Sequence, residues 1–414
     1  MAHDVSKENE RPALISWLNE LGSLLGLGPR VSLEVEELIH QAQRSTGLSD
    51  WGDEDVRPAL EILTRSLKEE SNLSTVGRII FRSYLNRLLS NRLKIQRDLT
   101  QMPEIRHMEV KRPLFIIGLP RTGSTLLQRL LARDPSVRSL QTWEMMCPSP
   151  PPAQETYLTD TRRRDAERRL KLLNWMAPEF ASVHEWTAGE PEECLSLLQA
   201  TLVSIVFEMM APVPSYSQWL ETQDLHQPYQ YYRQQLQLLQ YRMRGDHWVL
   251  KSPIHLFALK EVLEIFPDAR IIMTHRDPVK ILPSICSYFA VLYKLHCRDV
   301  DLTTLGPYWL EKWAAANDAA IDLREKVGND RFLDVDYRRL VKEPFGVVKE
   351  IYDHFDYELS PEALDAMTRW HANNPQHKHG VHQYSLEQFG LTAEQVDRRF
   401  ARYVAHFGVP TDKR

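Results

Sequence analysis

The feature that most constrains the fold is a short apolar run that leads into a glycine-containing loop and then into a helical period. From Arg112 this segment reads RPLFIIGLPRTGSTLLQRLLARDPS. A strand, a tight loop and a helix N-terminus in this order favour an anion, because glycines allow close backbone approach and the first helical amides point back at the loop. The alternative is a tight turn in which Ser124 or Thr125 only caps the helix. Since glycine is scarce, at 16 of 414 residues, we predict an anion-binding loop over 118–125.

Further apolar runs at 247–250, 270–274 and 331–335 predict more buried strands, each with helical sequence nearby. Strands that alternate with helices indicate a parallel sheet, because parallel pairing requires crossover connections and the crossover helices cover both faces. Amphipathic periods also predict a series of helices before the loop. We therefore predict a three-layer α/β fold with a P-loop-like phosphate-binding loop. Its parts are an N-terminal helical region over 1–110 and an α/β domain over 111–414, with a helical insertion at about 154–244.

Composition excludes several other classes of protein. With 43% hydrophobic and 26% charged residues the chain can bury a core, which argues against disorder. A net charge of -5 opposes nucleic-acid binding, since phosphate contacts need clustered cations. The four cysteines are widely spaced and predict neither a disulfide scaffold nor a zinc site. No segment approaches 18 uncharged apolar residues, so we expect a cytoplasmic protein without an integral membrane segment; its oligomeric state is left open.

The loop differs from a nucleoside-triphosphatase P-loop at one position. Gly118 and Gly123 have the P-loop spacing, yet Ser124 stands where a lysine would reach the β- and γ-phosphates. Arg121 inside the loop instead offers a planar cation to the anion. Hydrolysis of ATP or GTP is therefore disfavoured. A small-molecule kinase is kept as an alternative function, although the missing lysine counts against it.

A second cationic segment follows the predicted strand at 270–274. It reads HRDP, and Asp277 suits a helix cap while Pro278 suits a first helical turn. Ser284 lies eight residues beyond Arg276. Taken alone, Arg276 is equally well explained by a surface ion pair with Asp277.

Together the two segments resemble the sulfotransferase family that uses 3′-phosphoadenosine 5′-phosphosulfate (PAPS). The resemblance covers about 113–407 and is greatest to members with a helical N-terminal region. It implies a cradle for the 5′-phosphosulfate formed by Arg121, Thr122, Gly123, Ser124 and Thr125, and a grip on the 3′-phosphate by Arg276 and Ser284. The implied reaction moves a sulfuryl group from PAPS to a hydroxyl or amine, releases adenosine 3′,5′-bisphosphate (PAP) and requires no metal.

Sulfuryl transfer needs cations at the leaving phosphate and a base beside the acceptor. Lys251 ends a predicted strand, at the edge of an open sheet where ligands gather, so we predict Lys251 and Arg121 as the electrostatic pair. For the base we predict Glu144, in LQTWEM, because related tyrosylprotein-type sulfotransferases place a catalytic glutamate there. His255 and His184 are alternative bases.

Other polar clusters receive less specific interpretations. The acids of GEPEECL, which include Glu193, are what a helix N-terminus prefers after proline. The histidines of HKHGVHQY lack the carboxylate spacing of a metal site, and the resemblance implies instead a basic loop closing over the nucleotide through Lys378. The predicted acceptor is a small molecule: a lipid, sterol, phenol or glycan. A non-catalytic nucleotide-binding regulator stands as an alternative to an enzyme.

Overall fold

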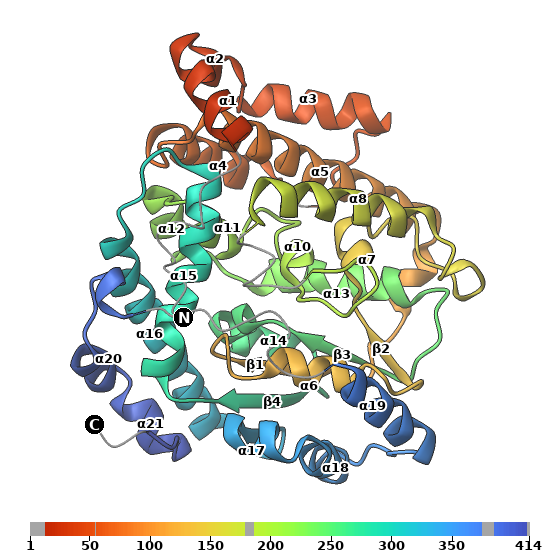
Figure 1. Ribbon diagram of the computed structural model, residues 1–414. Coiled ribbons are helices and arrows are strands. Elements are labelled where there is room, and N and C mark those ends of the chain that lie inside the picture. The colour runs from red at the N-terminus through yellow and green to blue at the C-terminus, as the bar shows by residue number, and fades with distance from the viewer. Residues whose placement is uncertain (1–12, 54, 179–185, 375–384, 412–414) are drawn as a thin grey trace.

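A five-stranded parallel sheet forms the centre of the protein (Figure 1). The computed structural model describes residues 13–53, 55–178, 186–374 and 385–411. The strands are β1 (Leu114–Gly118), β2 (Val137–Ser139), β3 (His247–Lys251), β4 (Arg270–His275) and β5 (Phe332–Asp336). Their spatial order is β2-β3-β1-β4-β5. The predicted parallel α/β fold is confirmed. The edge strand β2, which has only three residues, lies outside the strands predicted from the sequence.

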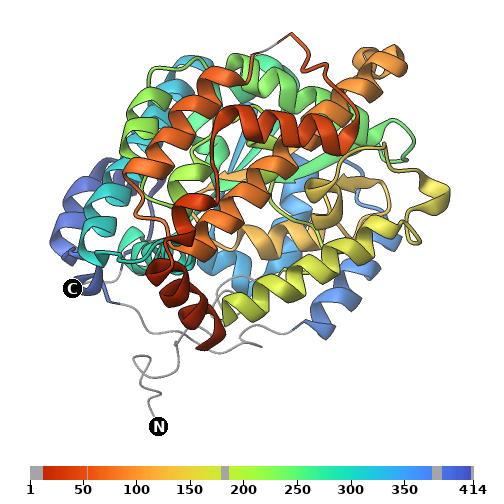
Figure 2. The ribbon, with the colours of Figure 1, turned by 90° about the horizontal axis from the view of Figure 1, so that it is seen from above.

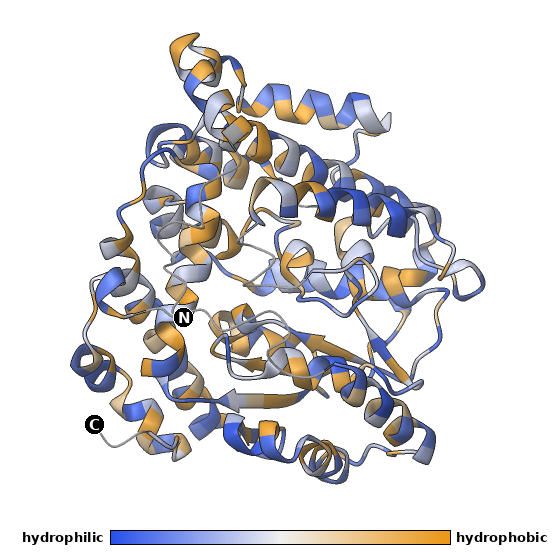
Figure 3. Ribbon diagram, in the orientation of Figure 1, coloured by the Kyte–Doolittle hydropathy of each residue, from blue (hydrophilic) through white to orange (hydrophobic). Residues whose placement is uncertain are grey.

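Both faces of the sheet are covered by helices, as expected for parallel strands. Leu114 and Ile116 of β1 belong to one buried cluster with α6 (Ser124–Leu131), α18 (Pro344–His354) and α19 (Pro361–Asn373). Phe115 and Ile117 point to the opposite cluster, which includes α14 (Leu259–Ile265) and α16 (Leu305–Val327). The strands are accordingly apolar along most of their length (Figure 3). Three layers result.

The N-terminal helices pack directly on this α/β core. They are α1 (Ala13–Leu24), α2 (Leu27–Arg30), α3 (Val35–Thr46), α4 (Arg57–Glu69) and the long α5 (Thr75–Gln101). The Ser74 side chain caps α5 by accepting a hydrogen bond from the Gly77 amide at 2.9 Å. Phe81 and Leu85 of α5 share one buried cluster with Phe115 of β1. The division of the chain at residue 110 stays a prediction, and the two segments share one core.

The insertion is helical, as predicted, but more broken than its sequence suggests. Its helices are α8 (Thr161–Met176), α10 (Leu195–Leu198), α11 (Val206–Met210), α12 (Pro214–Leu220) and α13 (His226–Gln240), and the short α7 (Thr142–Met146) precedes it. The apolar run after residue 194 looks continuous, yet α10 and α11 are separate. The buried Tyr216 hydroxyl accepts from the Ser204 amide at 2.9 Å and donates to the Leu202 carbonyl at 2.7 Å. These bonds satisfy backbone groups that a continuous helix would have paired internally.

The C-terminal third supplies the remaining helices. They are α15 (Pro278–His296), α17 (Tyr337–Lys342), α20 (Ala393–Arg399) and α21 (Ala401–Phe407). The predicted start of α15 is confirmed: Pro278 is its first residue, and the Asp277 carboxylate accepts from the Val279 amide at 3.0 Å. Within the described residues, no helix is both long and apolar enough to cross a bilayer.

Candidate active site

The loop after β1 holds a conformation that requires glycine. β1 pairs with β4 so that Gly118 lies opposite Thr274. Gly118 has φ 126°, and a Cβ there would lie 2.5 Å from the Thr274 carbonyl oxygen. Gly123, with φ 85°, directly precedes α6. The loop therefore turns tightly at the carboxyl edge of the sheet, and the first amides of α6 face it, as an anion cradle requires.

Thr122 stabilises the loop from within. Its side chain is 0% exposed, its hydroxyl donates to the Leu119 carbonyl at 2.7 Å, and it lies 2.6 Å from the Thr274 hydroxyl. These contacts occupy the hydroxyl, so Thr122 can offer a bound anion only its backbone amide. The role predicted for Thr122 is thereby restricted to the main chain.

Arg276, the first residue after β4, lies next to the loop. Its guanidinium stacks on the Tyr337 ring at 4.0 Å, and its Nη1 donates to the Arg121 carbonyl oxygen at 2.9 Å. Tyr337 follows β5, so three neighbouring strand ends converge here. The two cationic segments identified in the sequence are consequently adjacent, because β4 is the direct neighbour of β1.

A cavity of about 650 Å³ opens from this edge. Its polar wall is formed by Arg121, Gly123, Ser124, Thr125, Arg276 and Ser284. These are the donor contacts implied by the resemblance, with the exception of Thr122. The structure thus brings residues from the loop, the end of β4 and the helix α15 around one space.

The rest of the cavity is mostly apolar and follows α15, although Arg87, Arg169 and Gln199 also line it. Ser284 lines one end and His296 the other; twelve residues at 1.5 Å each make this wall about 18 Å long. The facing walls come from α5, α8 and α11. Five of the eleven methionines line the space, and their unbranched side chains adapt to varied apolar shapes. This part of the cavity suits an elongated apolar ligand.

Glu193 is the carboxylate that the structure places in the cavity wall. Its side chain is 15% exposed and forms an ion pair with the Lys251 ammonium, whose side chain is 2% exposed. Lys251 ends β3 as predicted. Lys251 does not itself line the cavity. Within the described residues, it is connected to the cavity through its ion pair with Glu193. The sequence pattern around Glu193 indicates only a helix start.

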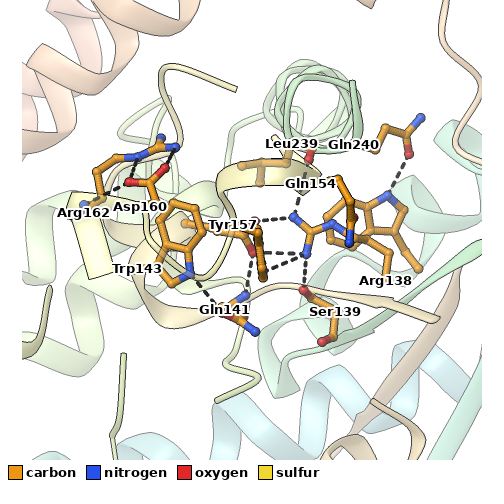
Figure 4. A network of polar contacts seen from close by, with 12 residues as sticks. Arg138, Ser139, Gln141, Trp143, Gln154, Tyr157, Asp160, Arg162, Leu239 and Gln240 are labelled. Atoms are coloured by element: carbon orange, nitrogen blue, oxygen red, sulfur yellow. Dashed lines mark hydrogen bonds and ion pairs between the residues drawn. The ribbon is translucent and has the colours of Figure 1, made fainter. Parts of the chain in front are cut away.

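The structure places Glu144, the predicted base, away from the cavity. Glu144 is 0% exposed, belongs to α7 rather than a strand end, and does not line the cavity. It forms an ion pair with the buried Arg138 of β2 and accepts a hydrogen bond from the Gln141 amide at 3.0 Å. Figure 4 shows Arg138 between Tyr157 and the Ser139 carbonyl. Because a buried guanidinium needs a carboxylate partner, Glu144 compensates the charge of Arg138, and its role as a base stays a prediction.

Replacement of Glu144 by Gln is therefore expected to reduce stability rather than chemistry. Loss of one member of a buried ion pair costs about 3 to 5 kcal/mol, so the free energy of unfolding measured with urea should fall by this order. Turnover per folded molecule should stay within a factor of about three. The control is Glu190→Gln, whose ion pair with Arg133 is more exposed. A Glu144→Gln protein of normal stability without turnover would restore Glu144 as the base.

Of the two alternative bases, His255 does not line the cavity either. His255 is 0% exposed, and its Nδ1 lies 2.9 Å from the Tyr229 hydroxyl. Burial lowers the pKa of His255 to about 3, so this imidazole is neutral at physiological pH and enclosed by aromatic rings. His184 and the Lys378 loop with its histidines lie outside the described residues.

The comparisons with known proteins agree with this site. Residues 113–361 match the sulfotransferase family, and the chain belongs to that family. It is therefore an enzyme that uses PAPS as its sulfuryl donor, and neither the kinase nor the non-catalytic regulator considered from the sequence is retained.

Two solved mycobacterial structures resemble most of the chain. Sulfotransferase STF1 of Mycobacterium tuberculosis is 35% identical, with 89% of this chain and 98% of that chain covered at a TM-score of 0.80. STF9 of Mycobacterium avium is 28% identical, with 92% and 99% covered at a TM-score of 0.82. A curated relative, the omega-hydroxy-beta-dihydromenaquinone-9 sulfotransferase Stf3 of Mycobacterium bovis, is 25% identical over 70% of this chain and 74% of its own.

Proposed function

We propose that this sulfotransferase sulfates the terminal hydroxyl of an elongated, mostly apolar small molecule. The observation that supports this function most strongly is that one cavity combines both parts: the anion loop, Arg276 and Ser284 lie at one end, and the mostly apolar wall of α15 continues for about 18 Å. The name of Stf3 describes a relative that acts on a lipid hydroxyl, which is the same chemical class. Sterols and long-chain quinols or alcohols fit this cavity better than glycans.

The chain's residues can hold the donor without a metal ion. PAPS brings a sulfuryl group on a mixed anhydride with phosphate, which supplies the driving force. In our proposal the amides of 122–125, the α6 dipole and Arg121 bind the phosphosulfate end, while Arg276 and Ser284 bind the 3′-phosphate. The Tyr337 ring and the Arg121 carbonyl hold the Arg276 guanidinium in a fixed orientation. Little reorganisation is then needed when charge develops on the leaving phosphate.

Glu193 replaces Glu144 as the proposed base. It is the carboxylate in the cavity wall, and Lys251 fixes its position. A carboxylate held in this way can accept the proton of the acceptor hydroxyl as the new bond forms. The apolar walls exclude water and so protect the donor against hydrolysis.

Arg276→Ala should mainly weaken donor binding. A charged hydrogen-bonding partner in a desolvated site contributes about 2 to 5 kcal/mol, so the Kd for PAP measured by calorimetry should rise by about 30-fold or more. The value of kcat at saturating PAPS should change far less. Arg398→Ala, on the exposed helix α20, is the matched control. Unchanged PAP affinity in Arg276→Ala would remove this residue from the donor site.

The acceptor class is tested with labelled PAPS and a panel of alcohols. We expect kcat/KM to rise with the length of an ω-hydroxylated apolar chain and to level off when the chain fills the cavity. Sugars and short phenols should be turned over poorly. A preference for glycans over all apolar alcohols would contradict the proposed acceptor class and leave the donor assignment intact.

A further inference from the structure

Exposed apolar side chains gather where the acceptor cavity opens. Of the twelve large hydrophobic residues exposed in the described chain, eight lie on α1, the turn after it, α5 and α8. Two of them, Ile79 and Leu172, also line the cavity while 51% and 54% exposed. The opening of the cavity is therefore bordered by these two side chains. We call the surrounding group the mouth patch, formed by Leu14, Trp17, Leu18, Ile79, Leu172 and Trp175.

Three helices bring the mouth patch together. α1 packs on α5 through the buried Ile15 and through Asn19, whose side-chain oxygen accepts from the Val76 amide at 3.0 Å. The first turn of α1 lies close to the last turn of α8 in both views (Figures 1 and 2). Leu173 and Met176 of α8 pack with Leu295 near the end of α15. The mouth patch therefore lies at the end of the cavity remote from the anion loop.

The exposed face of α8 combines this apolar end with positive charge. The helix carries six Lys or Arg residues and two acids, in a chain whose net charge is -5. Arg164, Arg168 and Lys171 are exposed and continue at helical spacing to Leu172 and Trp175. Arg168 also forms an ion pair with the exposed Asp165, so the basic residues outnumber the acids on this face without being free of them. A cationic stripe that leads into exposed Trp and Leu is the pattern of helices that lie in the interface of an anionic bilayer.

We propose that the mouth patch docks on an anionic phospholipid surface, so that the acceptor passes from the bilayer into the cavity without crossing water. This inference rests on the apolar acceptor of the proposed function. A bilayer explains three features at once: the apolar rim, the cationic stripe beside it, and the position of the cavity opening inside the rim. A protein partner would cover the opening through which the acceptor must enter.

Vesicle flotation tests the apolar contribution. The wild-type chain should float with vesicles that contain phosphatidylglycerol and much less with pure phosphatidylcholine vesicles. The double variant Trp17→Ser, Trp175→Ser should bind anionic vesicles at least about tenfold more weakly, because both rings leave the interface. The matched control, Val327→Ser with Leu364→Ser, removes exposed apolar side chains from α16 and α19 and should bind like the wild type.

Charge removal tests the electrostatic contribution. Each basic residue near an anionic surface contributes about 1 kcal/mol, so Arg164→Gln, Arg168→Gln and Lys171→Gln together should weaken binding by about 100-fold, less at high salt. The control triple, Arg369→Gln, Arg398→Gln and Arg402→Gln, removes the same charge from α19, α20 and α21 and should bind vesicles like the wild type.

The readouts separate this inference from the proposed function. None of the surface variants should change PAP affinity or kcat with a water-soluble acceptor. Absence of wild-type binding to anionic vesicles, together with normal PAP binding and turnover of apolar alcohols, would overturn the docking proposal alone. A wild-type dimer that Trp17→Ser, Trp175→Ser converts to a monomer would also overturn it, since the mouth patch would then be an interface between two copies.

Discussion

Glu193→Gln is expected to lower kcat by about 10² to 10⁴, because it removes the group that accepts the hydroxyl proton while its shape is kept. The change should appear in single-turnover transfer of labelled sulfate and should leave PAP affinity close to that of the wild type, whereas Tm should fall because the buried Lys251 ammonium loses its carboxylate partner. We expect the loss of kcat because Glu193 lies in the cavity wall, next to the apolar channel, and is paired with Lys251.

Glu190→Gln is the matched control for this variant, because Glu190 belongs to the same segment and pairs with Arg133 instead. It should retain turnover. A Glu193→Gln enzyme with a kcat within about threefold of the wild type would show that the proton leaves by another route.

Lys251→Met should lower kcat by about 10² or more, since Glu193 then loses the ammonium that fixes its carboxylate. Met keeps the apolar stem and volume of the site. Because Lys251 does not line the cavity, the Kd for PAP should change by less than about threefold. Comparing the effect on kcat with the effect on the Kd for PAP tests the role predicted from the sequence, a cation at the leaving phosphate. A direct contact between Lys251 and that phosphate would weaken PAP binding as well.

The double variant of Lys251 and Glu193 decides whether the two act as a unit. If Lys251 works through Glu193, the double variant should be no slower than Glu193→Gln alone. Effects that multiply would instead assign Lys251 an independent role. In that case the PAP titration of Lys251→Met should also show weaker binding.

The residues proposed to bind the donor could be predicted because they lie in short continuous segments of the sequence. A strand, two glycines, Arg121 and a helix start occupy adjacent positions in the chain, and Arg276 follows a strand with its own cap signal. Physics links such patterns to anions regardless of the rest of the fold. Their adjacency was not predictable, since it depends on β4 lying beside β1.

The acceptor side was not predictable for the opposite reason. Glu193 lines the cavity and pairs with the buried Lys251 only because its turn reaches the end of β3. Glu144 was a reasonable candidate from its place after the first crossover helix, yet nothing in the sequence reveals that Arg138 is buried and needs a counter-ion. Tertiary packing decides which of several acidic residues lines a cavity. A local sequence pattern does not predict this choice.

The wall that α5 contributes to the cavity lies outside the span that matches the family. Ile79, Ile80 and Tyr84 line the acceptor channel, whereas the matched span begins at residue 113. Substitutions in α5 can therefore change which acceptor is preferred. The residues proposed to bind the donor need not change with them. Chimaeras that exchange α5 between relatives are thus a direct way to change acceptor selectivity. A recombinant fragment limited to the matched span would lack the wall that α5 contributes to the cavity.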